Sequence, residues 1–253
     1  GKVYWLKAYQ IPQAGRGAKG RPLVNMLPLG EEERITAILP VKVFSQDRFI
    51  FMATANGTVK KTPLEQFSRP RSSGLIALAL DQDNTLVDCA LTDGDCDILL
   101  TSSSGKATRF KESDVRPMGR TARGVRGIKL SPGHSVISLI IPQEGGSVLS
   151  ASRNGFGKRT AVDDFPTRGR GGQGVIAIQR SERNGDLVSA LQVFEADELM
   201  LISNLGTLVR TPVVGVSLQG RNTQGVRLIR LREDENLVGA ERIVEAEGDG
   251  EEE

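Results

Sequence analysis

FMATANGTVKKT, at residues 51–62, is the stretch that decides the fold, because its central glycine belongs to a repeated pattern. Five leading glycines follow one another at intervals of 56, 48, 50 and 51 residues: Gly1, Gly57, Gly105, Gly155 and Gly206. A trailing glycine follows each of them after 19 residues, or after 17 in the second repeat: Gly20, Gly74, Gly124, Gly174 and Gly225. Self-similarity at about fifty residues indicates a propeller-like array of small sheets.

The runs between these glycines are short and rich in β-forming residues. A run such as LVNML at 23–27 or VIAIQ at 175–179 follows each trailing glycine, and further runs such as ITAILPV at 35–41 precede the next leading one. Turn signals such as DG at 93–94 and NG at 184–185 separate several of these runs. We therefore expect an all-β bladed fold with four short strands per repeat of about 50 residues, about nineteen in all, and single turns at 62–67 and 111–115.

The net charge of +2 hides an asymmetry between the body of the chain and its end. The last nine residues, EAEGDGEEE, carry six carboxylates, and without them 33 basic side chains stand against 25 acidic ones. A body this basic favours a polyanionic partner. We expect one bladed domain at 1–244 and an acidic disordered tail at 245–253, which either keeps the protein soluble or competes with DNA for the basic surface.

Positive charge recurs in register with the glycines. A cation stands four residues after the leading glycine in four repeats, and an arginine stands four residues before the trailing glycine in four repeats. Glycines allow the main chain to approach an anion, and arginines add charge-assisted hydrogen bonds to phosphate oxygens. The alternative is that Gly and Arg merely form solvated turns. The predicted DNA contacts are Arg16, Lys19, Arg21, Lys60, Lys61, Arg69, Arg71, Arg109, Arg120, Arg123, Arg126, Lys158, Arg159, Arg168, Arg170, Arg210, Arg221 and Arg227.

Other motifs give no catalytic or metal site. GxGxxG occurs at 15–20 and 169–174, but a strand-like run follows 174 where a dinucleotide fold needs a helix. Cys89 and Cys96 lack the paired spacing of a zinc site and are expected to be reduced thiols. No run approaches the roughly 20 apolar residues of a membrane span, and no signal peptide is present. We expect a cytoplasmic, nucleoid-associated protein without a cofactor or metal in this chain.

Several segments resemble the C-terminal DNA-wrapping domain of the bacterial DNA gyrase A family. They are FMATANGTVKKT at 51–62, RFKESDVRPMG at 109–119, TARGVRGIKL at 121–130, NGFGKRTAV at 154–162, GRNTQGV at 220–226 and the acidic end. The resemblance implies a six-bladed β-pinwheel, in which blades exchange strands and duplex DNA wraps around a basic rim. It also implies a non-catalytic part of an ATP-dependent type IIA topoisomerase that introduces negative supercoils. The gyrase B polypeptide would be a partner in a heterotetramer, with ATP and Mg bound elsewhere in the enzyme.

The chain lacks an intact copy of the family's QRRGGKG box. Residues 14–20, AGRGAKG, and 168–174, RGRGGQG, keep only part of it. Since Gly1 opens in mid-repeat, we expect the chain to be a fragment whose box lies upstream. Two alternatives remain: the corresponding domain of topoisomerase IV, and a propeller-like scaffold for protein interactions.

Overall fold

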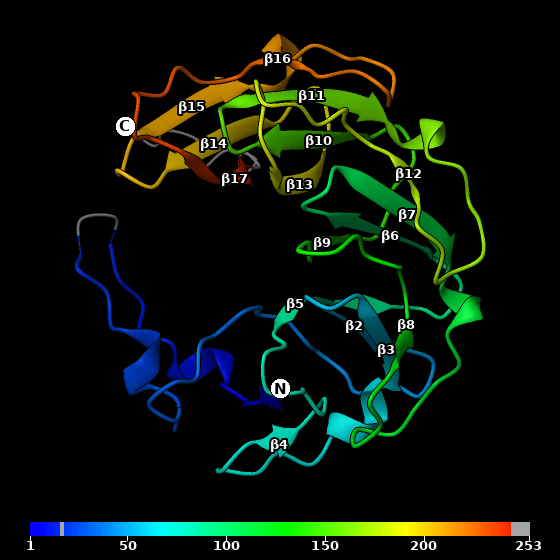
Figure 1. Cartoon of the computed structure of the whole chain (residues 1–253). Helices are drawn as coiled ribbons and strands as arrows, with labels where there is room; N and C mark the ends of the chain where they lie inside the picture. The colour runs from blue at the N-terminus through cyan, green and yellow to red at the C-terminus, as the bar shows by residue number, and fades with distance from the viewer. Residues whose placement is uncertain (16–17, 244–253) are drawn as a thin grey trace.

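The computed structural model describes residues 1–15 and 18–243, which form a series of small antiparallel sheets along an arc (Figure 1). These residues contain seventeen strands and six 3-10 turns, so the all-β prediction is confirmed, with slightly fewer strands than expected. None of their helices is long and apolar enough to cross a bilayer. The predicted acidic tail at 245–253 and Arg16 lie outside the described residues.

Three sheets have four strands, the last has three and the first has two. The first sheet pairs β1 (Lys2–Val3) with β4 (Leu75–Ile76). The second is β5 (Leu86–Thr92), β2 (Phe49–Thr54), β3 (Thr58–Pro63) and β8 (Val125–Arg126). The third is β9 (Val136–Ile140), β6 (Asp97–Ser102), β7 (Lys106–Lys111) and β12 (Val175–Ile176). The fourth is β13 (Leu187–Val193), β10 (Ser147–Ser152), β11 (Phe156–Ala161) and β16 (Val226–Arg227). The fifth is β17 (Leu237–Ile243), β14 (Glu198–Ser203) and β15 (Leu208–Pro212).

Each complete blade takes its outermost strand from the following repeat. In the second blade, Val59 and Thr58 of β3 lie opposite Val125 and Arg126 of β8. β12 and β16 pair in the same way with β7 and β11. The strands β5, β9, β13 and β17 line the inner side of the arc, and the lent strands lie on its outer side (Figure 1). The strand exchange implied by the gyrase resemblance is therefore present.

The paired glycines recur because backbones of neighbouring repeats meet at them. The carbonyl of Gly57 accepts hydrogen bonds from the N–H groups of Gly127 (2.8 Å) and Ile128 (3.3 Å) in the next repeat. Gly57 has φ +85°, and a Cβ there would lie 2.8 Å from the Ile128 carbonyl oxygen. Gly124 has φ +93°, and its Cβ would lie 2.6 Å from the Val59 carbonyl oxygen. Both positions therefore require glycine for its backbone angle and for its lack of a side chain.

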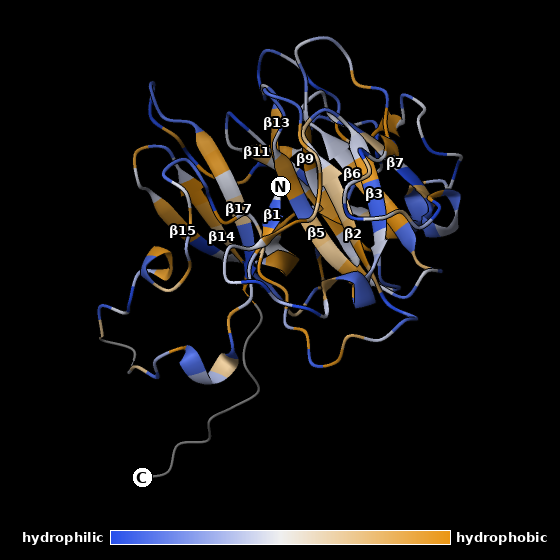
Figure 2. Cartoon of the chain, turned by 90° about the horizontal axis from the view of Figure 1, so that it is seen from below, coloured by the Kyte–Doolittle hydropathy of each residue, from blue (hydrophilic) through white to orange (hydrophobic). Residues whose placement is uncertain are grey.

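The hydrophobic cores lie between successive blades. The rings of Phe51 and Phe110, from adjacent blades, are 6.4 Å apart and tilted by 47°, within one cluster of buried residues. Hydrophobic residues concentrate on the strands, and the connecting loops are mostly hydrophilic (Figure 2). Each blade thus buries its faces against its neighbours, as the repeat pattern predicts.

The predictions for turns hold, but two strands expected in the described part of the first repeat do not form. The turns form as η3 (Leu64–Phe67) and η4 (Glu112–Asp114). The predicted strand at 23–27 contains η2 (Leu23–Asn25), and 35–41 contains no strand although Leu39 and Val41 pack on a core cluster. Neither segment has a described strand beside it to supply hydrogen bonds, and an isolated strand is not stable. VIAIQ at 175–179 forms only the two-residue β12.

We predict that Gly124→Ala lowers the free energy of unfolding by about 1–3 kcal/mol, because it adds both a strained backbone angle and a clash with the Val59 carbonyl. Gly119→Ala in the same loop is the control, since a Cβ there would contact only the Gln66 side chain, at 4.0 Å. Urea unfolding of both variants measures the difference. Equal stability of the two would contradict the proposed reason for the repeated glycines.

Candidate nucleic-acid interface

The loops that end at the trailing glycines run along the outside of the arc (Figure 1). We call residues 68–74, 115–124, 165–174 and 217–225 the rim loops. Ten of the predicted DNA contacts are exposed, and they occur in all five repeats. They are Lys19, Arg21, Arg69, Arg71, Arg123, Arg126, Arg168, Arg170, Arg210 and Arg227. Arg116, which the sequence analysis did not select, is also exposed on a rim loop.

The rim loops are joined to one another by arginines. Arg120 Nη1 donates to the Ile76 carbonyl at 3.4 Å, and Arg221 Nη1 donates to the Ile176 carbonyl at 3.2 Å. Arg170 makes the equivalent bond to the Arg126 carbonyl at 2.9 Å. In each case the arginine four residues before one trailing glycine reaches the residue two places after the preceding one. Sequence reasoning found this offset but read it only as a phosphate contact.

The cations four residues after the leading glycines face the next blade. Arg109 Nη1 donates to the Val162 carbonyl at 3.1 Å, and its Nε donates to Asp97 at 2.7 Å. Arg159, which is buried, donates from Nε to the Val216 carbonyl at 2.8 Å. In the last blade, Arg210 pairs with Glu198 of its own blade. Arg109 and Arg159 therefore connect neighbouring blades.

Lys61 occupies the same position in the second blade and is paired with a buried carboxylate. Its Nζ lies 3.7 Å from Glu112 Oε1 and donates to the Glu112 carbonyl at 3.2 Å. Lys61 and Glu112 are both buried. Burial with a protein partner does not support the prediction that Lys61 or Arg159 contacts DNA.

Lys60 and Lys158 fasten the rim loops from inside. Lys158 has no exposed surface, and its Nζ donates to the Gly220 and Arg221 carbonyls at 2.5 Å. Lys60, equally buried, donates to the Ala77 carbonyl at 2.8 Å and to the Arg120 carbonyl. Burial, reinforced by the nearby guanidiniums of Arg120 and Arg221, lowers the pKa of both lysines to about 8. Their arrangement positions the loops, and their amines are not available to a ligand.

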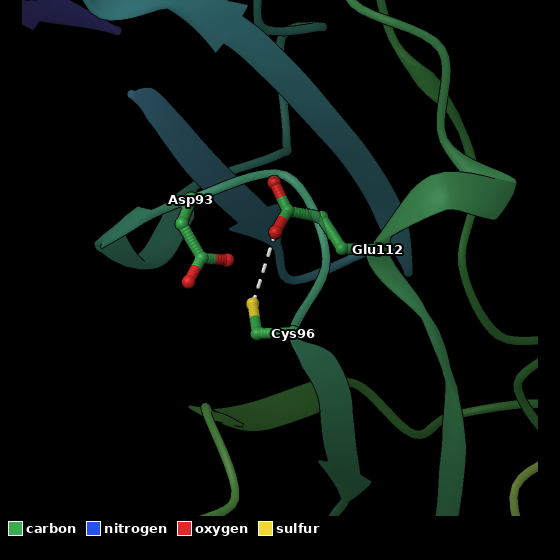
Figure 3. A group of neighbouring side chains, drawn as sticks. All are labelled: Asp93, Cys96 and Glu112. Carbon is green, nitrogen blue, oxygen red and sulfur yellow. Dashed lines mark hydrogen bonds between the residues drawn. The ribbon is translucent and has the colours of Figure 1, made fainter. Parts of the chain in front are cut away.

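Asp93, Cys96 and Glu112 come close enough together to be considered as metal ligands (Figure 3). Glu112 Oε1 accepts a hydrogen bond from Thr92 Oγ1 at 2.6 Å. Glu112 Oε2 accepts from the Gly94 N–H at 3.0 Å and from Cys96 Sγ at 2.9 Å. The carboxylate is thus fully engaged with protein donors, and the group acts as part of the contact between blades.

Both thiols are held in their protonated form. Burial, followed by the hydrogen bond to Glu112, raises the pKa of Cys96 to about 12. Burial, followed by the charge of Asp88, raises the pKa of Cys89 to about 11. Since the thiolate is the reactive species, neither cysteine has the chemistry of a nucleophile or of a metal ligand at neutral pH.

We predict that stability increases between pH 8 and 10.5 partly through Lys158. The folded chain releases this proton near the lowered pKa of about 8, whereas the unfolded chain keeps it to the ordinary 10.5. The unfolded state therefore binds more protons in this window, and the free energy of unfolding rises with pH. Lys158→Met should remove this contribution, and Lys129→Met, at an exposed position, should not. Denaturant unfolding at several pH values measures it; identical pH profiles for both variants would contradict the assignment.

Comparison with known proteins agrees with this geometry. The family model described as DNA gyrase C-terminal domain, beta-propeller, matches residues 1–42, 48–93, 97–143, 146–194 and 197–243. The A chain of DNA gyrase from Salmonella typhimurium is 55% identical over 251 residues, covering 99% of this chain and 29% of the relative. That of Pseudomonas aeruginosa is 52% identical over 291 residues, covering 98% and 32%. The present chain thus spans about a third of the length of these relatives.

Two solved structures share the fold. The DNA gyrase A C-terminal domain matches with a TM-score of 0.82 and 26% identity, over 96% of this chain and 80% of that one. The C-terminal domain of DNA topoisomerase IV matches with a TM-score of 0.83 and 25% identity, over 88% and 70%. With five matched segments that cover nearly all of its length, the chain belongs to the DNA gyrase C-terminal domain family of β-propellers.

Proposed function

We propose that this chain binds, bends and wraps duplex DNA along its rim loops, as the C-terminal domain of a DNA gyrase A polypeptide. The observation that carries the proposal is the recurrence of exposed arginines on rim loops that hydrogen bonds join to one another. Guanidinium groups suit phosphate oxygens, and a curved row of them follows a bent backbone. The described residues offer no zinc finger or recognition helix, so contacts fall mainly on the phosphates.

The energy of bending sets how many contacts the rim must supply. Bending 20–30 base pairs by 40–90° costs on the order of 1–6 kcal/mol. Several phosphate contacts, each releasing a counterion, offset such a cost at moderate salt. The exposed cations recur in every repeat, so the curved DNA meets new contacts as it passes from one blade to the next.

In the whole enzyme, the wrap would present one DNA segment to another with a preferred handedness, so that ATP-driven strand passage introduces negative supercoils. Catalysis, ATP and Mg would belong to the rest of gyrase A and to gyrase B in a heterotetramer. This domain would be a non-catalytic part that handles DNA, in the cytoplasm and near the nucleoid.

Two other functions are weighed against this one. The topoisomerase IV domain has an equally similar fold, but the 55% identity to a gyrase A sequence favours gyrase. Supercoiling by the reconstituted full-length enzyme, as opposed to decatenation alone, distinguishes the two. A protein-interaction scaffold needs no exposed cation in every repeat, and failure to retain duplex DNA in a gel shift would favour it.

We predict that log K for duplex DNA falls against log salt with a slope of roughly −7, for about eight phosphate contacts. The double variant Arg123→Gln/Arg168→Gln should reduce this slope by about 2 and lower affinity about tenfold, because it removes two exposed rim cations. Arg48→Gln is the control, since Arg48 is exposed but lies outside the segments bounded by paired glycines. Fluorescence anisotropy at several salt concentrations gives the slopes.

The outcome separates the rim from the rest of the surface. A wild-type slope near zero would contradict DNA binding through phosphates. Equal losses in the double variant and in Arg48→Gln, counted per charge removed, would contradict the rim as the binding surface.

A further inference from the structure

Phe156, on β11, lies beneath two guanidinium groups. Arg183 Cζ lies 4.4 Å from the centre of the Phe156 ring, and Arg227 Cζ lies 5.3 Å from it. The Phe156 side chain is only 7% exposed, whereas both arginines are exposed. An aromatic face attracts a guanidinium and restricts where it lies. One ring therefore gathers two cations at one place on the surface.

The backbone holds Arg227 over the ring. In the pairing of β11 with the lent strand β16, Arg227 lies directly opposite Phe156. Side chains directly opposite one another in an antiparallel pair lie on the same face of the sheet. The exchange of strands between repeats therefore places Arg227 beside Phe156.

A fully buried asparagine holds the turn that carries Arg183. Asn184 Nδ2 donates to the Gln179 carbonyl at 2.8 Å and to the Gln224 carbonyl at 3.2 Å. Gln224 lies three residues before Arg227, so this amide connects the turn of one arginine to the segment of the other. Asn154, two residues before Phe156, donates to the Arg183 carbonyl at 3.1 Å.

Neither arginine has a counter-ion in the part of the chain that the structure describes. Among residues 1–15 and 18–243, no carboxylate lies within ion-pair distance of Arg183 or Arg227. Asp186, in the same turn as Arg183, pairs instead with Arg180 at 2.9 Å. Two like charges gathered on one ring repel each other, and an anion between them removes that repulsion. A guanidinium that stacks by its face keeps its N–H edge for phosphate oxygens.

The arrangement is specific to one blade. The position of Phe156 is taken by Thr58 in the second blade, opposite Arg126, and by Lys106 in the third, opposite Ile176. The position of Arg183 is taken by Asp83 and Gly133 in the corresponding turns. Among the described residues, no other complete blade therefore combines an aromatic ring with two arginines.

We propose that Arg183 and Arg227, positioned by Phe156, form a two-arginine site for a phosphate group of the DNA backbone on the fourth blade. This inference rests on the proposed function and adds Arg183 to the binding surface. The site holds the duplex more firmly at this blade than at the others, because its two cations are already in place before DNA arrives.

The test is a double-mutant cycle on duplex affinity with Arg183→Gln, Arg227→Gln and their combination. Each single variant should bind about five- to tenfold more weakly, with a salt slope smaller by about 0.9. The double variant should lose less than the product of the two single losses, because the arginines share one phosphate. Phe156→Leu keeps both charges, so it should weaken binding at least threefold while leaving the salt slope unchanged.

Arg153→Gln is the matched control, because Arg153 is exposed nearby but its Nε is bonded to Asn236 at 3.0 Å. Losses in Arg183→Gln and Arg227→Gln no greater than in Arg153→Gln, in a wild type that binds duplex, would overturn the site but not the proposed function. A wild type that does not bind duplex would overturn both. Inorganic phosphate is titrated separately: competition with duplex at equal ionic strength, abolished by Arg183→Gln, would overturn the assignment to DNA in favour of free phosphate.

Discussion

The close backbone contact between successive repeats is the constraint on which the structure depends. The carbonyl of each of the first four leading glycines accepts two N–H groups from the following repeat, as Gly57 does from Gly127 and Ile128. A side chain at either member of a glycine pair would push these backbones apart. Because the contact also brings the lent strand to the outer edge of the preceding blade, it fixes where the next rim loop begins. The fold and the binding surface therefore have the same origin.

The periodic cations serve two different purposes. Arg109 and Arg159 face inward and connect one blade to the next, whereas Arg123 and Arg168 are exposed on the rim loops. A buried lysine such as Lys158 carries a desolvation cost, which its two carbonyl acceptors offset only in part, as the lowered pKa shows. Its position beneath a rim loop suggests that the loop must be held in place for the outer arginines to stay in line.

The repeats, the blades and the short turns could be predicted from the sequence, because hydrophobic pattern and glycine spacing report directly on them. The division of the cations could not, since inward and outward cations recur with the same period and differ only in which neighbour they meet. Lys61 shows this best: its partner Glu112 lies in the next repeat, at a position where Leu64 and Val162 are apolar. Residues 35–41 have a strand-like sequence but lack a neighbouring strand among the described residues. Arg183 was missed because no offset from a glycine marks it.

The most direct measurement is the protection of individual arginines from phenylglyoxal by duplex DNA, read by mass spectrometry. A continuous rim predicts that Arg69, Arg123, Arg168 and Arg227 react in the free protein and are all protected by a duplex long enough to wrap. Buried Arg159 should be unreactive in both states. Protection confined to a single repeat, or shared equally by Arg34 and Arg48 outside the rim, would contradict the account.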